Sequence, residues 1–69
     1  MNQKETLPER LKDLRKRNNL TQKQIAEKLC ISQQAYASYE TGKKEPKIDT
    51  LRMLADIFKT SIDYLVGRY

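Results

Sequence analysis

The sequence contains no histidine and no tryptophan, and Cys30 is its single cysteine. A lone cysteine cannot form an internal disulfide or a cysteine-based zinc cluster, and it is typical of a reducing compartment. Because histidine is missing and no nucleophile lies beside a plausible general base, we do not expect an enzyme. Apolar runs approaching the roughly 18 residues of a membrane span are missing too, as is a signal-peptide pattern. These absences predict a cytoplasmic protein without a metal, a cofactor, a membrane partner or a small-molecule ligand.

What is present is a short, basic chain. At 69 residues it can bury one small core of modest stability, and no repeat, linker or low-complexity stretch divides it. We therefore expect residues 1–69 to form a single domain, which is either a complete protein or the N-terminal part of a longer one. The net charge of +5 and the isoelectric point of about 9.5 favour a polyanionic partner, although a small basic domain is also often merely soluble.

Residues 21–42 have the pattern of two helices joined by a very short turn. Thr21 and Gln24 form a capping box, which predicts the start of a helix. Apolar residues then recur at helical spacing at Ile25, Ala26 and Leu29. Only residues 30–32 intervene before a second helix, for which Ser32 is a suitable N-cap. A turn this short predicts two helices that cross at a steep angle, as in a helix-turn-helix.

Three further helices are predicted outside this segment. The first begins at the capping box of Thr6 and Glu9 and ends at Asn18–Asn19; another spans about Ile48–Phe58, and a short last helix begins at Thr60 or Ser61. Their inward apolar residues are Leu7, Leu11, Leu14, Leu51, Leu54, Ala55, Phe58, Ile62, Leu65 and Val66. Since no alternating apolar run predicts a strand, we expect an all-α fold, a compact bundle of five short helices.

The second helix of the 21–42 segment has two chemically different sides. Tyr36, Tyr39 and Glu40 fall on one side, and at this spacing the two tyrosines are better explained as core than as base-stacking residues. The opposite side is uncharged and polar, and it consists of Gln33, Gln34, Ala37, Ser38 and Thr41. Amides, hydroxyls and a methyl group are the chemistry that suits the edges of base pairs.

This segment resembles the helix-turn-helix of the Cro and repressor family of phage and bacterial transcription regulators, also described as xenobiotic-response-element-like. The matching residues are the small Ala26, the apolar or aromatic Ile25, Leu29, Ile31, Tyr36 and Tyr39, and the ending Glu40–Lys43 followed by Pro46. The similarity extends over about residues 7–66. The resemblance implies a lambda-repressor-like domain that acts as a sequence-specific transcription regulator, a repressor, with residues 32–41 as a recognition helix in the major groove of double-stranded DNA.

The resemblance also assigns base contacts. In the resembling repressors, the residue after the N-cap and its neighbour contact base edges, and these positions are Gln33 and Gln34 here. A glutamine amide can pair with N6 and N7 of adenine, whereas in an arbitrary protein the same residues would only solvate a helix start. Ser38 lies one turn further along the same face, and Ala37 is placed to contact a thymine methyl group.

Contacts to phosphates are expected from the start of the first helix of the motif and from the basic loop after the second. The expected phosphate-binding residues are Thr21, Gln22, Ser32, Lys43, Lys44 and Lys47. A merely solvated loop is the alternative for the lysines. A second basic cluster, Arg10, Lys12, Lys16 and Arg17, is interpreted as a solubilising face.

Two further expectations concern structure. In the resembling repressors the positions of Arg15 and Glu40 form an ion pair that joins the first helix to the recognition helix. Cys30 and Lys59 stand where glycine is common in the family, so their turns are expected to be strained if the backbone is left-handed.

The family generally binds inverted repeats as a homodimer, and we expect the same here, with a free chain that is largely monomeric. The candidate dimer residues are Tyr64, Tyr69, Met53 and Ile57, unless these side chains merely complete the core. The alternative function is a protein-interaction module, such as an antitoxin or an adaptor, which would need an apolar recognition-helix face.

Overall fold

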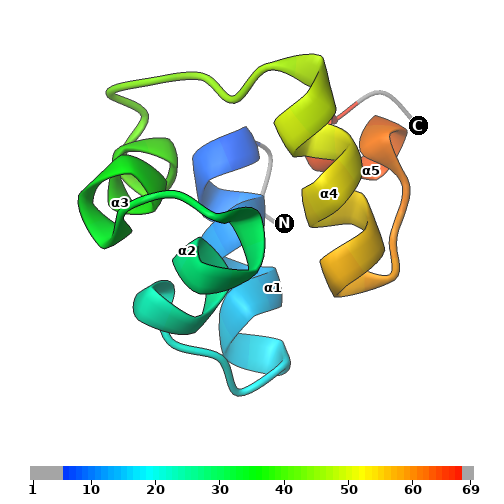
Figure 1. Cartoon of the computed structure of the whole chain (residues 1–69). Helices are drawn as coiled ribbons and strands as arrows, with labels where there is room; N and C mark the ends of the chain where they lie inside the picture. The colour runs from blue at the N-terminus through cyan, green and yellow to red at the C-terminus, as the bar shows by residue number, and fades with distance from the viewer. Residues whose placement is uncertain (1–5, 68–69) are drawn as a thin grey trace.

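Five α-helices make up all the regular secondary structure in residues 6–67, the part of the chain that the computed structural model describes (Figure 1). They are α1 (Leu7–Arg17), α2 (Gln22–Leu29), α3 (Gln33–Thr41), α4 (Ile48–Phe58) and α5 (Ile62–Val66). The all-α prediction is confirmed, and so is the place of each helix along the sequence.

Local hydrogen bonds determine where the helices begin. The capping boxes of Thr6 with Glu9 and of Thr21 with Gln24 are both formed. The Ser32 hydroxyl accepts a hydrogen bond from the Ala35 amide at 3.0 Å, which starts α3, and Ser61 starts α5 in the same way. Each of these bonds satisfies an amide that the helix leaves without a backbone partner.

Left-handed residues end all five helices, either at the C-cap or just beyond it. Gly42 ends α3 with φ of 81°, a conformation that glycine adopts without steric cost. Asn19, Cys30 and Lys59 adopt φ of 57°, 61° and 53° after α1, α2 and α4. The backbone at Cys30 and Lys59 is therefore left-handed, which is the condition under which strain was expected there, and it costs on the order of 1 kcal/mol at each site relative to glycine.

The helices pack around one core. Helix α1 packs against α3 and α5, and α2 packs against α3 and α4, so that α4 and α5 lie together on the side remote from α3 (Figure 1). The most deeply buried large side chains are Tyr36, Leu11, Ile25, Leu54 and Leu65. The prediction for Val66 is wrong, because Val66 is 37% exposed. It lies about 100° round α5 from Leu65, which fills the core position instead.

A network of charged and polar groups joins the first three helices. Arg15 Nε on α1 donates to Glu40 Oε2 on α3 at 2.7 Å, and Arg15 Nη2 donates to Glu40 Oε1 at 3.2 Å. The same arginine donates from Nη1 to the Leu20 carbonyl at 3.0 Å, and Gln22 Nε2 on α2 donates to Glu40 Oε1 at 3.1 Å. The predicted ion pair is thus present, and it lies in a network that also includes α2.

This network keeps both partners charged. Burial opposes ionisation of Glu40, but the hydrogen bonds from Arg15 and Gln22 and the charge of Arg15 outweigh it and lower the pKa of Glu40 below its ordinary value. The hydrogen bond to Glu40 raises the pKa of Arg15 above its ordinary value. Burial, reinforced by the Glu40 carboxylate, raises the pKa of Tyr36, so the phenol stays neutral.

We expect Arg15→Met and Glu40→Gln each to destabilise the fold by about 3 kcal/mol, because either change leaves a buried charged partner unpaired. For a domain of this size, that loss corresponds to a drop in melting temperature of more than roughly 10 °C, measurable by circular dichroism. Lys12→Met is the matched control, since Lys12 is an exposed residue of the same helix. If both test variants had the same melting temperature as the control, the ion pair would not stabilise the fold.

The lowered pKa of Glu40 also predicts that the stabilising effect of this residue depends on pH. Because folding lowers the pKa of Glu40, this group stabilises the protein above its unfolded-state pKa of about 4.5, and the contribution is lost as the pH falls through the folded-state pKa. The difference in unfolding free energy between wild type and Glu40→Gln should therefore shrink below pH 4.5. Urea titrations of both proteins across this pH range measure the difference. A difference in unfolding free energy that did not change with pH would contradict a lowered pKa of Glu40 in the folded state.

Candidate nucleic-acid interface

Helix α3 presents its uncharged polar side outward because its aromatic side is anchored in the core. Tyr36 is fully buried, and Tyr39 is half-buried with its ring edge-on to that of Tyr36 at a centroid distance of 6.2 Å. The interpretation of these tyrosines as core residues is confirmed. Gln33 and Gln34, on the first turn of α3, are both exposed. Their amides are therefore accessible to a ligand.

The second turn of α3 continues this surface as a shallow groove. The residues that line it are Gln34, Ala37, Ser38, Thr41 and Lys43. Three of the four predicted base-contacting residues thus border a single depression, beside the first lysine of the basic loop, and Gln33 adjoins it in sequence. None of the lining residues is acidic, so nothing within the groove repels a polyanion.

The polar residues expected to bind phosphates at the helix starts already have partners within the chain. Thr21 forms the capping box with Gln24, in which its hydroxyl accepts from the Gln24 amide at 3.1 Å. The Ser32 hydroxyl caps α3, and the half-buried Gln22 side chain donates to Glu40. The groups that remain available to a ligand here are therefore mainly the first backbone N–H groups of the helices, which have no acceptor within the helix.

The basic loop folds back onto α3. The amides of Lys43 and Lys44 both donate to the Ser38 carbonyl, at 3.0 and 3.3 Å, which holds the start of the loop against the end of the helix. Both lysine side chains are exposed. Lys47 is exposed as well, but it lies at the other end of the loop as the N-cap of α4. Of the three, Lys43 is the one that borders the α3 groove.

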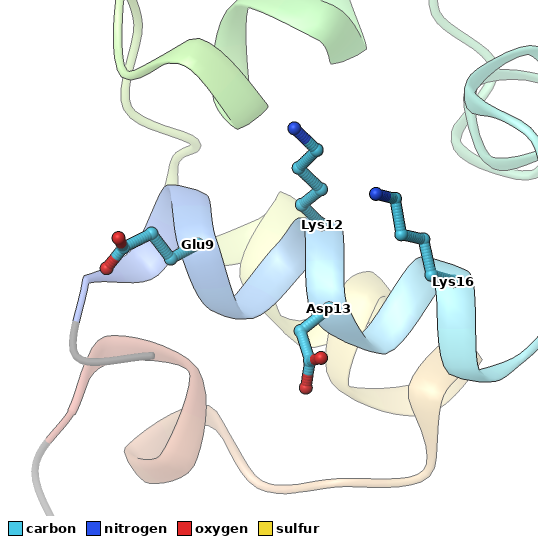
Figure 2. Close-up of a pocket in the computed structure, with 4 residues that line it drawn as sticks. All are labelled: Glu9, Lys12, Asp13 and Lys16. Carbon is cyan, nitrogen blue, oxygen red and sulfur yellow. The ribbon is translucent and has the colours of Figure 1, made fainter. Parts of the chain in front are cut away.

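The second basic cluster is not a uniform solubilising face. Lys12 and Lys16 extend side by side from α1, but Glu9 and Asp13 line the same hollow (Figure 2). Asp13 also forms an ion pair with Arg17 at 3.0 Å. This surface therefore combines both signs of charge and has no clear preference for an anion.

Arg10 departs from the prediction altogether. It is 3% exposed, and its guanidinium lies 5.3 Å from the centre of the Tyr64 ring, where a cation–π contact links α1 to α5. The expectation that Arg10 belongs to a solvated face is wrong. The sequence did contain a clue, since Arg10 lies between Leu7 and Leu14 at helical spacing on the apolar stripe of α1.

The candidate dimer residues have different environments. Met53 is 40% exposed, whereas Ile57 and Tyr64 are half-buried and pack against the core. The Tyr64 ring stacks beneath Arg10 and packs against the core, so most of its side chain is not available to a second copy. Tyr69 lies outside the described residues. Of the four candidates, Met53 is the one whose apolar surface is clearly available.

Two other kinds of site were searched for within residues 6–67. No group of three or more acidic, cysteine or histidine side chains there is arranged to hold a metal ion. None of the helices in this range has the length and apolar character needed to cross a membrane.

Comparison with known proteins is consistent with this geometry. Residues 11–65 match the Helix-turn-helix family. The chain is 43% identical over 60 residues to the transcriptional regulator AnsR of Bacillus subtilis, covering 87% of this chain and 52% of that protein. It is 41% identical over 63 residues to the cryptic phage CTXphi transcriptional repressor RstR of Vibrio cholerae, covering 91% and 56%.

A solved structure with a similar fold is that of the P22 c2 repressor in complex with a synthetic operator. It superposes with a TM-score of 0.86 at 25% identity, over 93% of this chain and 97% of that one. The present chain spans about half the length of the curated relatives it matches. On the family match and the sequence identities together, the chain belongs to the helix-turn-helix family.

Proposed function

We propose that this chain is a cytoplasmic repressor domain that recognises a specific operator with residues 32–41 in the major groove. The observation that supports this most directly is the outward side of α3, where Gln33 and Gln34 are exposed while Tyr36 is fully buried. A protein-interaction module would need an apolar surface at this position. The residues proposed to contact bases are Gln33, Gln34, Ser38 and Ala37.

The proposed phosphate contacts lie on both sides of this surface. The start of α2 at Thr21 and Gln22, and the start of α3 at Ser32, contribute backbone amides. The exposed Lys43 and Lys44, with Lys47 further along the loop, contribute positive charge on the other flank. These contacts supply affinity that is independent of sequence, whereas the α3 side chains supply specificity.

We further propose that two chains bind an inverted repeat, one recognition helix to each half-site. A single α3 of nine residues is about 13 Å long and spans only a few base pairs, so specificity benefits from a second copy one helical turn away. Met53 on α4 is proposed as the centre of the dimer contact because its side chain is exposed and apolar. Ile57 and Tyr64 are proposed at its edge. Tyr69, which lies outside the described residues, stays a proposed dimer residue.

The first prediction for this function concerns specificity. Gln33→Ala should weaken binding to the cognate operator, identified by in vitro selection, by about 1–3 kcal/mol, because a bidentate contact to one base pair is lost. Binding to random duplex DNA should hardly change. Fluorescence anisotropy with both DNAs measures the two affinities. Equal losses on cognate and random DNA would show that Gln33 does not contact a base.

A second prediction concerns the salt dependence. If Lys43 neutralises a phosphate, Lys43→Ala should weaken binding to all sequences alike and reduce the slope of log K against log salt concentration by about 0.9. Lys28→Ala is the matched control, because Lys28 is an exposed lysine of α2 outside the proposed interface. Identical slopes for the two variants would remove Lys43 from the set of phosphate contacts.

A third prediction concerns assembly. Sedimentation velocity should show two chains on one palindromic operator, and Met53→Lys should reduce the cooperativity of their binding without weakening binding to an isolated half-site. Glu27→Lys on α2 adds positive charge at another exposed position and controls for general electrostatics. One chain per palindrome at saturation, or unchanged cooperativity in Met53→Lys, would exclude the proposed contact.

A further inference from the structure

The five helices differ in the charge of their first turn. Helices α1, α4 and α5 each have an acidic residue there, namely Glu9, Asp49 and Asp63, whereas the first turns of α2 and α3 have none. The N-terminus of a helix has a partial positive charge that attracts anions, and an acidic side chain in the first turn offsets this attraction. The two helix starts that are proposed to contact phosphates are therefore the two at which the attraction is not offset.

The basic loop leads directly into the start of α4, where Lys47 is the N-cap and forms no capping hydrogen bond with its side chain. Pro46 is buried, whereas Glu45 and Lys47 on either side of it are both exposed. Since they are two residues apart, the Cα atoms of Glu45 and Lys47 are separated by at most about 7 Å. The ammonium group of Lys47 thus has a carboxylate close by on the exposed side of the loop.

Asp49 adds a second exposed carboxylate two residues after Lys47. Within residues 6–67, the side chains of Glu45 and Asp49 have no hydrogen-bond or ion-pair partner, so neither charge is neutralised by this part of the chain. Both carboxylates would repel a phosphate that approaches Lys47. The environment of Lys43 is different, because Lys43 lines the α3 groove and no acidic residue borders that groove.

We infer, on the basis of the proposed function, that Glu45 and Asp49 limit the affinity of this chain for DNA phosphates at the start of α4. The two carboxylates offset the charge of Lys47 and the partial charge of the helix N-terminus, so Lys47 binds the DNA backbone more weakly than Lys43 does. Because phosphates are the same in every sequence, this repulsion lowers the affinity for all duplexes alike. Its consequence is faster release from random DNA.

Removal of either carboxylate tests this repulsion. At low salt, Glu45→Gln and Asp49→Asn should each tighten binding about two- to threefold, the effect of one charge about 7 Å from a phosphate in water. The gain should be the same on the selected operator and on random duplex DNA, both measured by fluorescence anisotropy. Asp56→Asn is the matched control, because it removes the same charge from an exposed position about two turns further along α4. Test variants that bound no more tightly than the control would overturn the inference.

A double-mutant cycle then links the two carboxylates to Lys47. In the wild type, Lys47→Ala should reduce the slope of log K against log salt concentration by less than half of the roughly 0.9 expected for a full phosphate contact. In a chain with both Glu45→Gln and Asp49→Asn, the same substitution should reduce the slope by about 0.9. Equal reductions in the two backgrounds would overturn the inference but leave the proposed function intact. If Lys43→Ala did not change the slope and Gln33→Ala did not change specificity, both would fail.

Discussion

The orientation of α3 depends on the ion pair between Arg15 and Glu40. Helix α3 has nine residues, and Tyr36 is the only one of them that is fully buried, so hydrophobic contacts alone hold it at few points. The two-point contact between guanidinium and carboxylate fixes the rotation of the helix about its axis as well as its distance from α1. A buried pair of this kind adds little net stability over an apolar pair, but its geometry is specific. Together with the buried aromatic side of α3, that specificity determines which side of the helix faces outward.

The same network couples the two proposed parts of the DNA surface. Gln22 stands at the first position of α2 and donates to the carboxylate that Arg15 also binds, so the N-terminus of α2 and the body of α3 share one anchor. A disturbance of Glu40 would therefore displace a phosphate contact and the base contacts together. By contrast, Arg10 contacts Tyr64 and joins α1 to α5.

The features that could be predicted from the sequence are those determined by neighbours within a few residues. The caps at Thr6, Thr21, Ser32 and Ser61 each depend on a hydrogen bond to a residue three positions ahead, and a pattern of that length is visible in the sequence. Arg15 and Glu40 are 25 residues apart, and their pairing was expected from a family resemblance, since no spacing indicates it. The environments of Tyr64 and Val66 could not be predicted because α5 is too short to define an inward side by periodicity, so only its packing against α1 and α4 decides. Arg10 lies on the apolar stripe of α1, but its charge pointed to solvent, and its contact with the ring of Tyr64 on α5 is not visible in the sequence.

Hydrogen-bond direction on α3 is a further property that composition alone does not reveal. Serine and threonine can donate to a ligand or to the carbonyl three or four residues earlier, and which of these occurs depends on the rotamer. In this structure Ser38 and Thr41 both bond to the helix, which divides the outward side of α3 into two chemically different parts. The first turn offers amides that donate and accept, whereas the second offers methyl groups and acceptors. An exchange of serine for alanine at position 38 would thus remove an acceptor but no donor, so its effect should depend on whether the facing base carries an amino group.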